Sequence, residues 1–125
     1  MKVVSKLVYQ GPIFSIESYV APDGSCPAED WLESQSLKMQ QKFTALFVLL
    51  GNVGRIFNEQ KFKHLTGTDQ VFEFKADQGR VLCFFFVGKR VVLTHGFSKK
   101  SHKTPRGEID RAEKIKSEFT RRSKR

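Results

Sequence analysis

The sequence predicts an α+β fold, because segments with two different hydrophobic periods follow one another along the chain. Apolar residues recur at three- and four-residue steps over about residues 28–50 and again over residues 109–119, which is the period of an amphipathic helix. Residues 71–97 instead alternate with a period of two between short polar turns, as consecutive antiparallel strands do. The 125 residues suffice for one hydrophobic core, so we expect a single domain over residues 1–125.

The N-terminal segment predicts strand followed by helix. Residues 2–19 carry β-branched and aromatic side chains around Gly11-Pro12, so we expect one or two strands broken by a turn. A second turn cluster occupies residues 21–25. Pro27 then marks a helix start, because proline suits the first helical position and acidic residues follow it.

The apolar stripe after Pro27 continues to Leu50. It forms either one helix or, if residues 34–36 interrupt it, two helices joined as an αα-hairpin. Gly51 and Gly54 predict the C-terminal end, where glycine commonly follows the last helical turn.

Three antiparallel strands are predicted next. In residues 71–76 the alternation places Glu73 and Lys75 on the face directed away from the core. Residues 80–87 are apolar on both faces beyond Arg80 itself, which is typical of a central strand. A turn at residues 88–89 leads into the third strand.

The C-terminal segment predicts a helix. Thr104 is a candidate N-cap, and Pro105 suits the first helical position. The apolar stripe of this helix comprises Ile109, Ala112, Ile115 and Phe119.

Positive charge is concentrated in the second half of the chain. The net charge of the whole chain is +9. Residues 1–60 contain five Lys or Arg and six Asp or Glu, whereas residues 61–125 contain 17 and seven. Cationic side chains crowd directly after the last predicted strand, at Lys99, Lys100, His102 and Lys103. This asymmetry predicts a surface for nucleic acid or another polyanion, and the alternative for the tail is a solvated basic helix.

Strand topology brings several of these cations together. Lys75 and Arg80 lie near the same end of the first hairpin, and the last strand finishes beside Arg80, where Lys99 and Lys100 follow. Convergent cations can bind successive phosphates and stabilise a phosphorane-like transition state. The alternative is that Lys75 and Glu73 merely form an exposed pair on one strand.

Metal and ordinary hydrolase chemistry lack support in the sequence. His64, His95 and His102 share no metal-ligand spacing with Cys26 and Cys83, and there is no HExxH, CxxC or Gly-rich phosphate loop. We therefore expect no metal and no cofactor. Two cysteines, with no apolar segment long enough for a signal peptide or membrane span, predict a cytoplasmic protein without a membrane partner.

A long stretch of the chain resembles a known family. Residues 88–105 read GKRVVLTHGFSKKSHKTP and are followed by Glu108-Ile109 and Ala112. This run closely resembles the C-terminal signature of phage-derived, HigB-like toxins of the RelE/ParE superfamily. Upstream, the resemblance is extended by KHL at 63–65, VFEFK at 71–75 and RVL at 80–82, so that about residues 28–119 are covered.

The resemblance implies a RelE-like fold, in which a twisted, mostly antiparallel sheet carries two helices on one face, together with a C-terminal helix. It also implies a toxin that enters the ribosome and cleaves mRNA there, as a metal-independent endoribonuclease that inhibits translation. The ribose 2′-hydroxyl attacks the adjacent phosphate in this reaction. The implied partners are the ribosome, mRNA and a cognate helix-turn-helix antitoxin, which would form a hetero-oligomer with the toxin.

Catalytic positions follow from the same resemblance. Lys75 and Arg80 match basic residues on two strands, and the pair of lysines that includes Lys100 matches the basic position after the last strand. Glu73 stands where RelE carries a lysine and is a candidate proton acceptor. His102 is the other candidate base, because neighbouring cations would keep it neutral near pH 7. The RNA or the ribosome itself is the third possibility.

Further contacts to RNA are expected around this site, at Lys61, Lys63, His64, Lys99 and Lys103. The tyrosine on which RelE stacks a base is missing, and the nearest aromatic candidates are Phe97 and His102. His95 alternates with Leu93 and Phe97 on the last strand, which predicts a packed and hydrogen-bonded residue.

Two other functions remain open at the level of sequence. The ParE type of the same fold poisons DNA gyrase without cutting RNA. A phage-derived binding protein with a decayed active site is the second, and the acidic Glu73 favours it.

Overall fold

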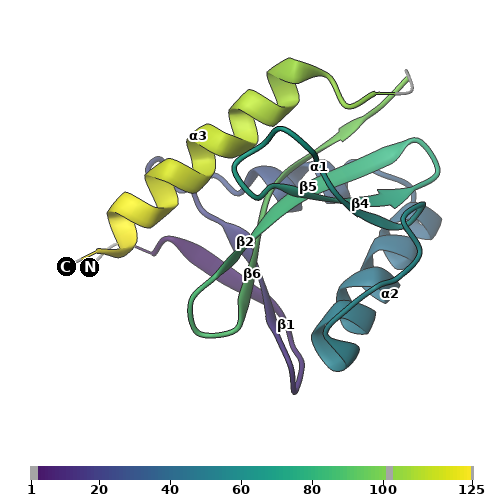
Figure 1. Cartoon of the computed structure of the whole chain (residues 1–125), viewed down its shortest axis with the longest axis horizontal. Helices are drawn as coiled ribbons and strands as arrows, with labels where there is room; N and C mark the ends of the chain where they lie inside the picture. The colour runs from purple at the N-terminus through teal and green to yellow at the C-terminus, as the bar shows by residue number, and fades with distance from the viewer. Residues whose placement is uncertain (1–2, 101–102, 125) are drawn as a thin grey trace.

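The computed structural model describes residues 3–100 and 103–124, which form a six-stranded mixed sheet and three helices (Figure 1). In chain order the elements are β1 (Ser5–Gln10), β2 (Ser15–Tyr19), α1 (Pro27–Glu33), α2 (Leu37–Val53), β3 (Phe62–His64), β4 (Phe72–Ala76), β5 (Gly79–Phe86), β6 (Arg90–Ser98) and α3 (Arg106–Ser123). The predicted α+β class is thereby confirmed. None of the helices in the described ranges combines the length and apolar character that a membrane crossing requires.

The sheet order is β1-β2-β6-β5-β4-β3, with β5 and β6 at the centre. The β2–β6 pair is parallel and the other four neighbouring pairs are antiparallel. The N-terminal segment therefore supplies two strands, and the central position predicted for residues 80–87 is confirmed. Three consecutive antiparallel strands, β4 to β6, bring Lys75, Arg80 and the end of β6 to one end of the sheet.

Residues 34–36 do interrupt the predicted helix, giving α1 and α2. The hydroxyl of Ser36 accepts a hydrogen bond from the Met39 amide and so caps α2. Gly54 ends α2 in the left-handed conformation at φ 89°, which glycine adopts without steric penalty.

Gly51 lies inside α2, so its prediction as a helix end is wrong. Its carbonyl accepts hydrogen bonds from the amides of Ile13 and Phe14 at 2.9 and 3.1 Å. A Cβ at Gly51 would lie 3.0 Å from the Tyr9 ring. The glycine thus permits the β1–β2 turn to approach the helix closely.

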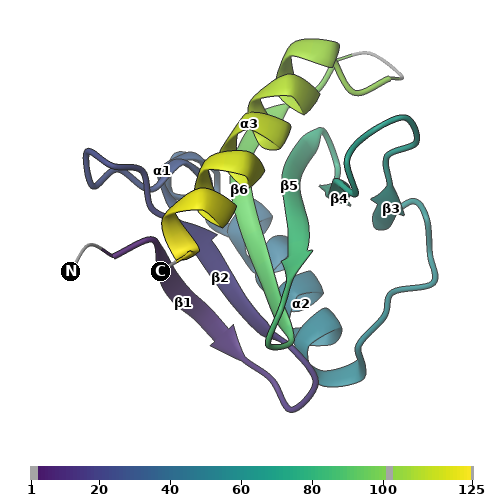
Figure 2. The ribbon, with the colours of Figure 1, turned by 60° about the vertical axis from the view of Figure 1, so that its left-hand side comes forward.

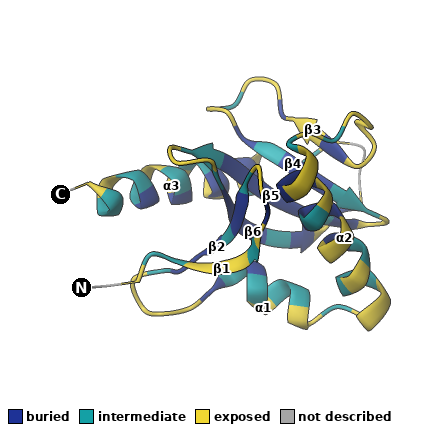
Figure 3. Cartoon of the chain, turned by 90° about the horizontal axis from the view of Figure 1, so that it is seen from below, coloured by how far each residue is buried: buried dark blue, intermediate teal, exposed yellow. Residues whose placement is uncertain are grey.

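Helices cover both faces of the sheet (Figure 2). On one face α1 and α2 bury an apolar cluster that includes Phe43, Phe47, Phe74, Val81 and Leu93. On the other face α3 packs its predicted stripe, Ile109, Ala112, Ile115 and Phe119, against the opposite side chains of β5 and β6. Dark buried residues consequently run through the centre of the sheet, between the exposed outer surfaces of β1 and α2 (Figure 3).

An irregularity in β6 changes which face its later residues use. Leu82 pairs with His95 and Cys83 pairs with Leu93, so Thr94 is an extra residue that lacks a partner position. Leu93 therefore belongs to the cluster under α1 and α2, whereas His95 lies on the α3 side, next to Glu108. The prediction that His95 shares a face with Leu93 is wrong, because the bulge reverses the alternation.

The segment before α3 corrects the predicted start of this helix and the predicted exposure of Glu73. Pro105 is the N-cap residue, and the Thr104 hydroxyl donates a hydrogen bond to Glu73 Oε2 at 2.5 Å instead of capping the helix. Glu73 does point away from the core under α1 and α2, but it is only 1% exposed. The segment leading into α3 covers it, so it is not the solvated strand residue that the alternation predicts.

Candidate functional site

A pocket of about 410 Å³ lies on the α3 face of the sheet, where β3 and β4 meet the segment that leads into α3. Cations dominate its lining. The polar side chains that surround it are Lys63, Lys75, Lys99, Lys103, Glu73, Thr66 and Thr104. We refer to it below as the basic pocket.

Strand register brings these residues together from four segments of the chain. Lys63 of β3 pairs with Glu73 of β4, and Lys75 pairs with Arg80 of β5. The amide of Lys99 donates to the Gln78 carbonyl at 2.8 Å, which holds the end of β6 against the β4–β5 turn. The convergence expected from the hairpin topology is therefore present for Lys75, Arg80 and Lys99.

Glu73 is the buried carboxylate at the centre of this group. Its Oε2 accepts the hydrogen bond from Thr104, and its Oε1 lies 3.9 Å from Nε of Arg80. A carboxylate this deeply buried is costly unless cations and hydrogen-bond donors surround it. The positive side chains of the pocket thus compensate Glu73, and Glu73 in turn reduces the repulsion between them.

Arg80 is anchored by the backbone. One terminal nitrogen donates to the carbonyls of Asp77 and Gly79, at 2.8 and 2.7 Å. Its Nε is buried and makes no hydrogen bond within the described part of the chain. The guanidinium group is therefore held in place by the backbone, with its Nε 3.9 Å from Glu73 Oε1.

Burial lowers the pKa of both Lys75 and Lys99 from the ordinary lysine value. The positive charges of Lys63 and Arg80 lower these pKa values further. The negative charge of Glu73 acts in the opposite direction and raises both. Both ammonium groups are consequently better proton donors than exposed lysines.

The two lysines after β6 differ sharply in position. Lys99 is 7% exposed and lines the basic pocket, whereas Lys100 is exposed and is not among the lining residues. Of the two, the structure therefore brings Lys99, rather than Lys100, to Lys75 and Glu73. His102 lies outside the described residues.

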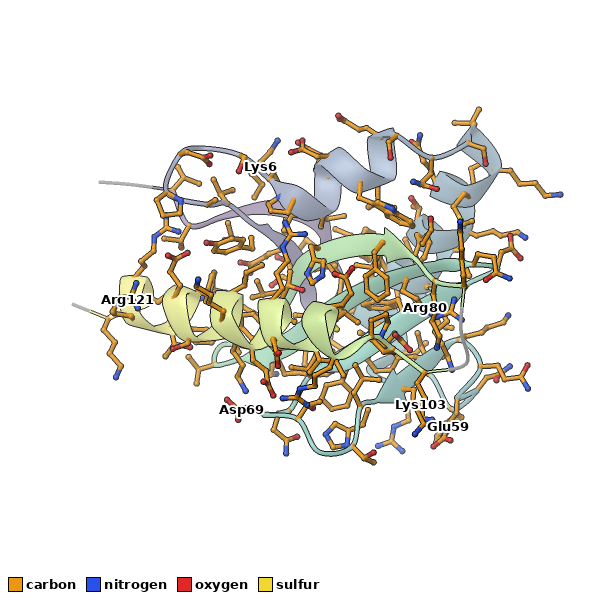
Figure 4. The ribbon with its side chains drawn as sticks, turned by 90° about the horizontal axis from the view of Figure 1, so that it is seen from above. Lys6, Glu59, Asp69, Arg80, Lys103 and Arg121 are labelled. Atoms are coloured by element: carbon orange, nitrogen blue, oxygen red, sulfur yellow. The ribbon has the colours of Figure 1, made fainter. Side chains whose placement is uncertain are left out.

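The predicted RNA contacts divide between the basic pocket and its surroundings. Lys63 and Lys103 line the pocket. Lys61 lines a different pocket beside α2, and His64 is exposed, with its ring 4.9 Å from that of Phe72. In Figure 4, Arg80 and Lys103 lie at one end of the molecule, and Arg121 lies toward the other.

His95 is a packed, hydrogen-bonded residue, as predicted. It is 1% exposed, and its ring nitrogens lie 3.1 Å from Thr94 Oγ1 and 2.9 Å from Glu108 Oε1. Burial lowers its pKa, although the bond to Glu108 opposes the shift. Phe97 stacks on this ring and is 8% exposed, so it is a packing residue rather than a platform for a base.

Sequence reasoning missed Thr104 as the partner of Glu73, because threonine before Pro105 has the pattern of a helix cap. It also missed Lys42, Asn58 and Gln60, which line the pocket beside α2 together with Lys61. No motif marks these residues. They meet only when α2 and the loop before β3 are packed together.

A family comparison covers most of the chain. The model described as "Phage derived protein Gp49-like (DUF891)" matches residues 30–117, more than two thirds of the sequence. The match includes every lining residue of the basic pocket and leaves out β1 and β2. No curated protein matches the chain.

Proposed function

Because the chain belongs to the Gp49-like family of phage-derived proteins, which is part of the RelE/ParE-like toxin superfamily, we propose that it is a toxin of a toxin–antitoxin system. We further propose that it has a RelE-like fold and HigB-like specificity and inhibits translation by cleaving mRNA on the ribosome. The observation that carries the proposal is the convergence of four lysines and Arg80 around one buried carboxylate.

Charge supports an RNA ligand for this pocket. Four lysines line it and Arg80 lies beside Glu73, so the cations exceed the single carboxylate among the lining residues. Such an excess attracts a phosphodiester, and each phosphate contact releases counterions from the nucleic acid. Arg80 adds a further positive charge next to the pocket, with its Nε 3.9 Å from Glu73 Oε1.

The proposed reaction needs only groups of the RNA and of this pocket. The 2′-hydroxyl oxygen bonds to the adjacent phosphorus, its proton passes to a base, and the bond from phosphorus to the 5′-oxygen breaks. The products are a 2′,3′-cyclic phosphate and a protonated 5′-hydroxyl.

Pocket residues supply each of these roles. Glu73 is suited to accept the proton, and Lys75 or Lys99, with their lowered pKa values, to protonate the leaving oxygen. Arg80 stabilises the charge that develops on the phosphate, a contribution of about 3 kcal/mol for one such donor.

Mapping of mRNA 5′ ends after brief induction tests the proposal. Discrete new ends within translated codons are expected for the wild type and should be lost in Lys75→Ala and Arg80→Ala. Lys114→Ala and Arg121→Ala are matched controls, because they remove the same charges from exposed positions of α3. Arg80→Lys and a melting curve for each variant separate lost chemistry from lost folding.

Two other outcomes would point to the alternatives. DNA damage with intact mRNA would refute the nuclease and support a gyrase inhibitor of the ParE type. Intact mRNA and intact DNA would favour a binding protein whose pocket has lost activity, with Glu73 standing where the resemblance implies a lysine.

The proposed partners are the ribosome with its mRNA and a helix-turn-helix antitoxin, which neutralises the toxin in the cytoplasm as part of a hetero-oligomer. Co-expression with a small helix-turn-helix protein from the neighbouring reading frame is the corresponding test. Restored growth and co-purification are expected. If growth is not restored and the two proteins do not co-purify, the proposed antitoxin partner is refuted.

A further inference from the structure

A second pocket of about 410 Å³ lies between α2, the loop before β3 and the end of β4. Apolar side chains of α2 and β4 line it together with polar ones. The residues that matter here are Lys42, Leu46, Asn58, Gln60, Lys61 and Lys75. We call it the amide pocket after Asn58 and Gln60.

Lys75 lines both pockets, so the two pockets adjoin at this residue. A ligand chain whose phosphate lies in the basic pocket can continue past Lys75 into the amide pocket. Lys61 and Lys63 are two positions apart at β3, a spacing of about 6.6 Å in a strand. They line the amide and basic pockets respectively, so cations accompany such a chain on both sides of Lys75.

The amide pocket also offers contacts that a phosphate alone would not use. Leu46 and the neighbouring Ala45 and Ala76 provide an apolar wall of the kind that packs against a flat ring. Asn58 and Gln60 each carry a carbonyl acceptor and an amino donor, the pair of groups that reads a base edge.

The loop that carries these two side chains is held by its own hydrogen bonds. Asn58 Oδ1 accepts from the backbone N–H of Gln60 at 2.9 Å, and the backbone carbonyl of Asn58 accepts from the backbone N–H groups of Lys61 and Phe62. On the opposite wall, Lys42 donates to Asp77 Oδ2 at 2.7 Å. The pocket is thus shaped before a ligand arrives, and specificity depends on such preorganisation.

We propose, on the basis of the proposed RNA cleavage, that the amide pocket binds the nucleotide next to the cleaved phosphate and selects its base through Asn58 and Gln60. Lys61 contacts the phosphate of that nucleotide. Lys75 lies between the two subsites, so it links base selection to the reacting phosphate.

The first test is the base composition around the mapped cleavage ends. Wild type should show a bias at one position beside the cut. Asn58→Asp keeps the oxygen that accepts from Gln60 but removes the amino donor, and Gln60→Ala removes both groups. One lost hydrogen bond corresponds to about a fivefold weaker bias. Gln41→Ala, at an exposed position of α2 outside the pocket, is the matched control and should retain it.

The second test does not depend on cleavage. A 2′-O-methyl tetranucleotide cannot react, and 4-thiouridine placed beside its central linkage crosslinks to the residues that touch it. Crosslinked peptides containing residues 58–61 are expected.

These tests have separable outcomes. Cleavage ends with an unchanged bias in both variants would overturn the amide pocket while leaving the nuclease intact. Crosslinks only elsewhere, or none, would also overturn it. Crosslinks at residues 58–61 without any mRNA cleavage would retain the nucleotide subsite and refute the nuclease.

Discussion

Replacement of Glu73 by glutamine separates the electrostatic role of this residue from its proposed role as a base. Glu73 Oε1 lies 3.9 Å from Arg80 Nε, and the residue is 1% exposed. Two unit charges at this separation attract each other by about 4 kcal/mol at an effective dielectric constant of about 20. Glutamine keeps the shape and an acceptor for Thr104 but removes the charge, so the pocket attracts phosphate more strongly.

Stability and RNA binding should change in opposite directions. The hydrogen bond from Thr104 to a charged acceptor becomes one to a neutral acceptor, and the remaining cations repel one another, so we expect the free energy of unfolding to fall by about 1–2 kcal/mol. This corresponds to a decrease of about 4–8 °C in Tm. Binding of a non-cleavable single-stranded RNA should become about five- to tenfold tighter, since the carboxylate no longer opposes the phosphate.

Cleavage should fall even though binding tightens. Loss of a general base reduces the rate by about 100-fold or more. Fluorescence anisotropy with 2′-O-methyl RNA measures the affinity, and quantitative 5′-end mapping measures cleavage in cells. Undiminished cleavage by Glu73→Gln would refute the role as a base, and unchanged RNA affinity would refute the electrostatic reasoning.

Three further predictions follow from the same geometry. Thr104→Val leaves the Glu73 carboxylate without its hydroxyl donor and should lower the free energy of unfolding by about 1–3 kcal/mol, whereas Thr104→Ser should restore it; urea titration decides. Lys99→Ala should reduce the slope of log affinity against log salt by about 0.7 for single-stranded RNA, and Lys100→Ala should change it less; equal effects would contradict the assignment of Lys99 to the pocket. Burial lowers the pKa of His95 in the folded state, so the unfolded state binds more protons below pH 6.5. The free energy of unfolding therefore falls as the pH falls through this range. Between pH 7 and pH 5 the Tm of His95→Asn should fall less than that of the wild type.

The bulge at Thr94 shows one limit of reading the sequence. Strict alternation places His95 beside Leu93, in the core under α1 and α2, but the extra residue turns it toward Glu108 of α3. Gly96 lies two residues from Thr94, but a glycine inside a strand indicates either a bulge or a close approach, and at Gly96 the absent Cβ makes room for the Trp31 ring. The position of the bulge follows from the partner strand, which offers Leu82 to His95 and Cys83 to Leu93.

Glu73 shows a second limit. Its place on the polar side of β4 was predictable, since alternation in a regular strand is local. Its burial was not, because the segment that covers it lies about thirty residues away, and Thr104 in that segment has the sequence pattern of a helix cap. The difference between Lys99 and Lys100 has the same origin. Adjacent residues leave a strand in different directions, and only the packing against the β4–β5 turn decides which one enters the pocket.

The sequence by itself did not reveal β3 and left the number of N-terminal strands open. It did determine the α+β class, the consecutive strands β4 to β6, the α3 stripe and the concentration of cations at the end of these strands. These features depend on hydrophobic period, helix signals and short antiparallel turns, all of which act over a few residues. The tertiary structure alone decided that a buried carboxylate lies among the cations and that Lys75 joins two pockets. Burial and shared cavities depend on surfaces that meet only when distant segments pack, so no local pattern encodes them.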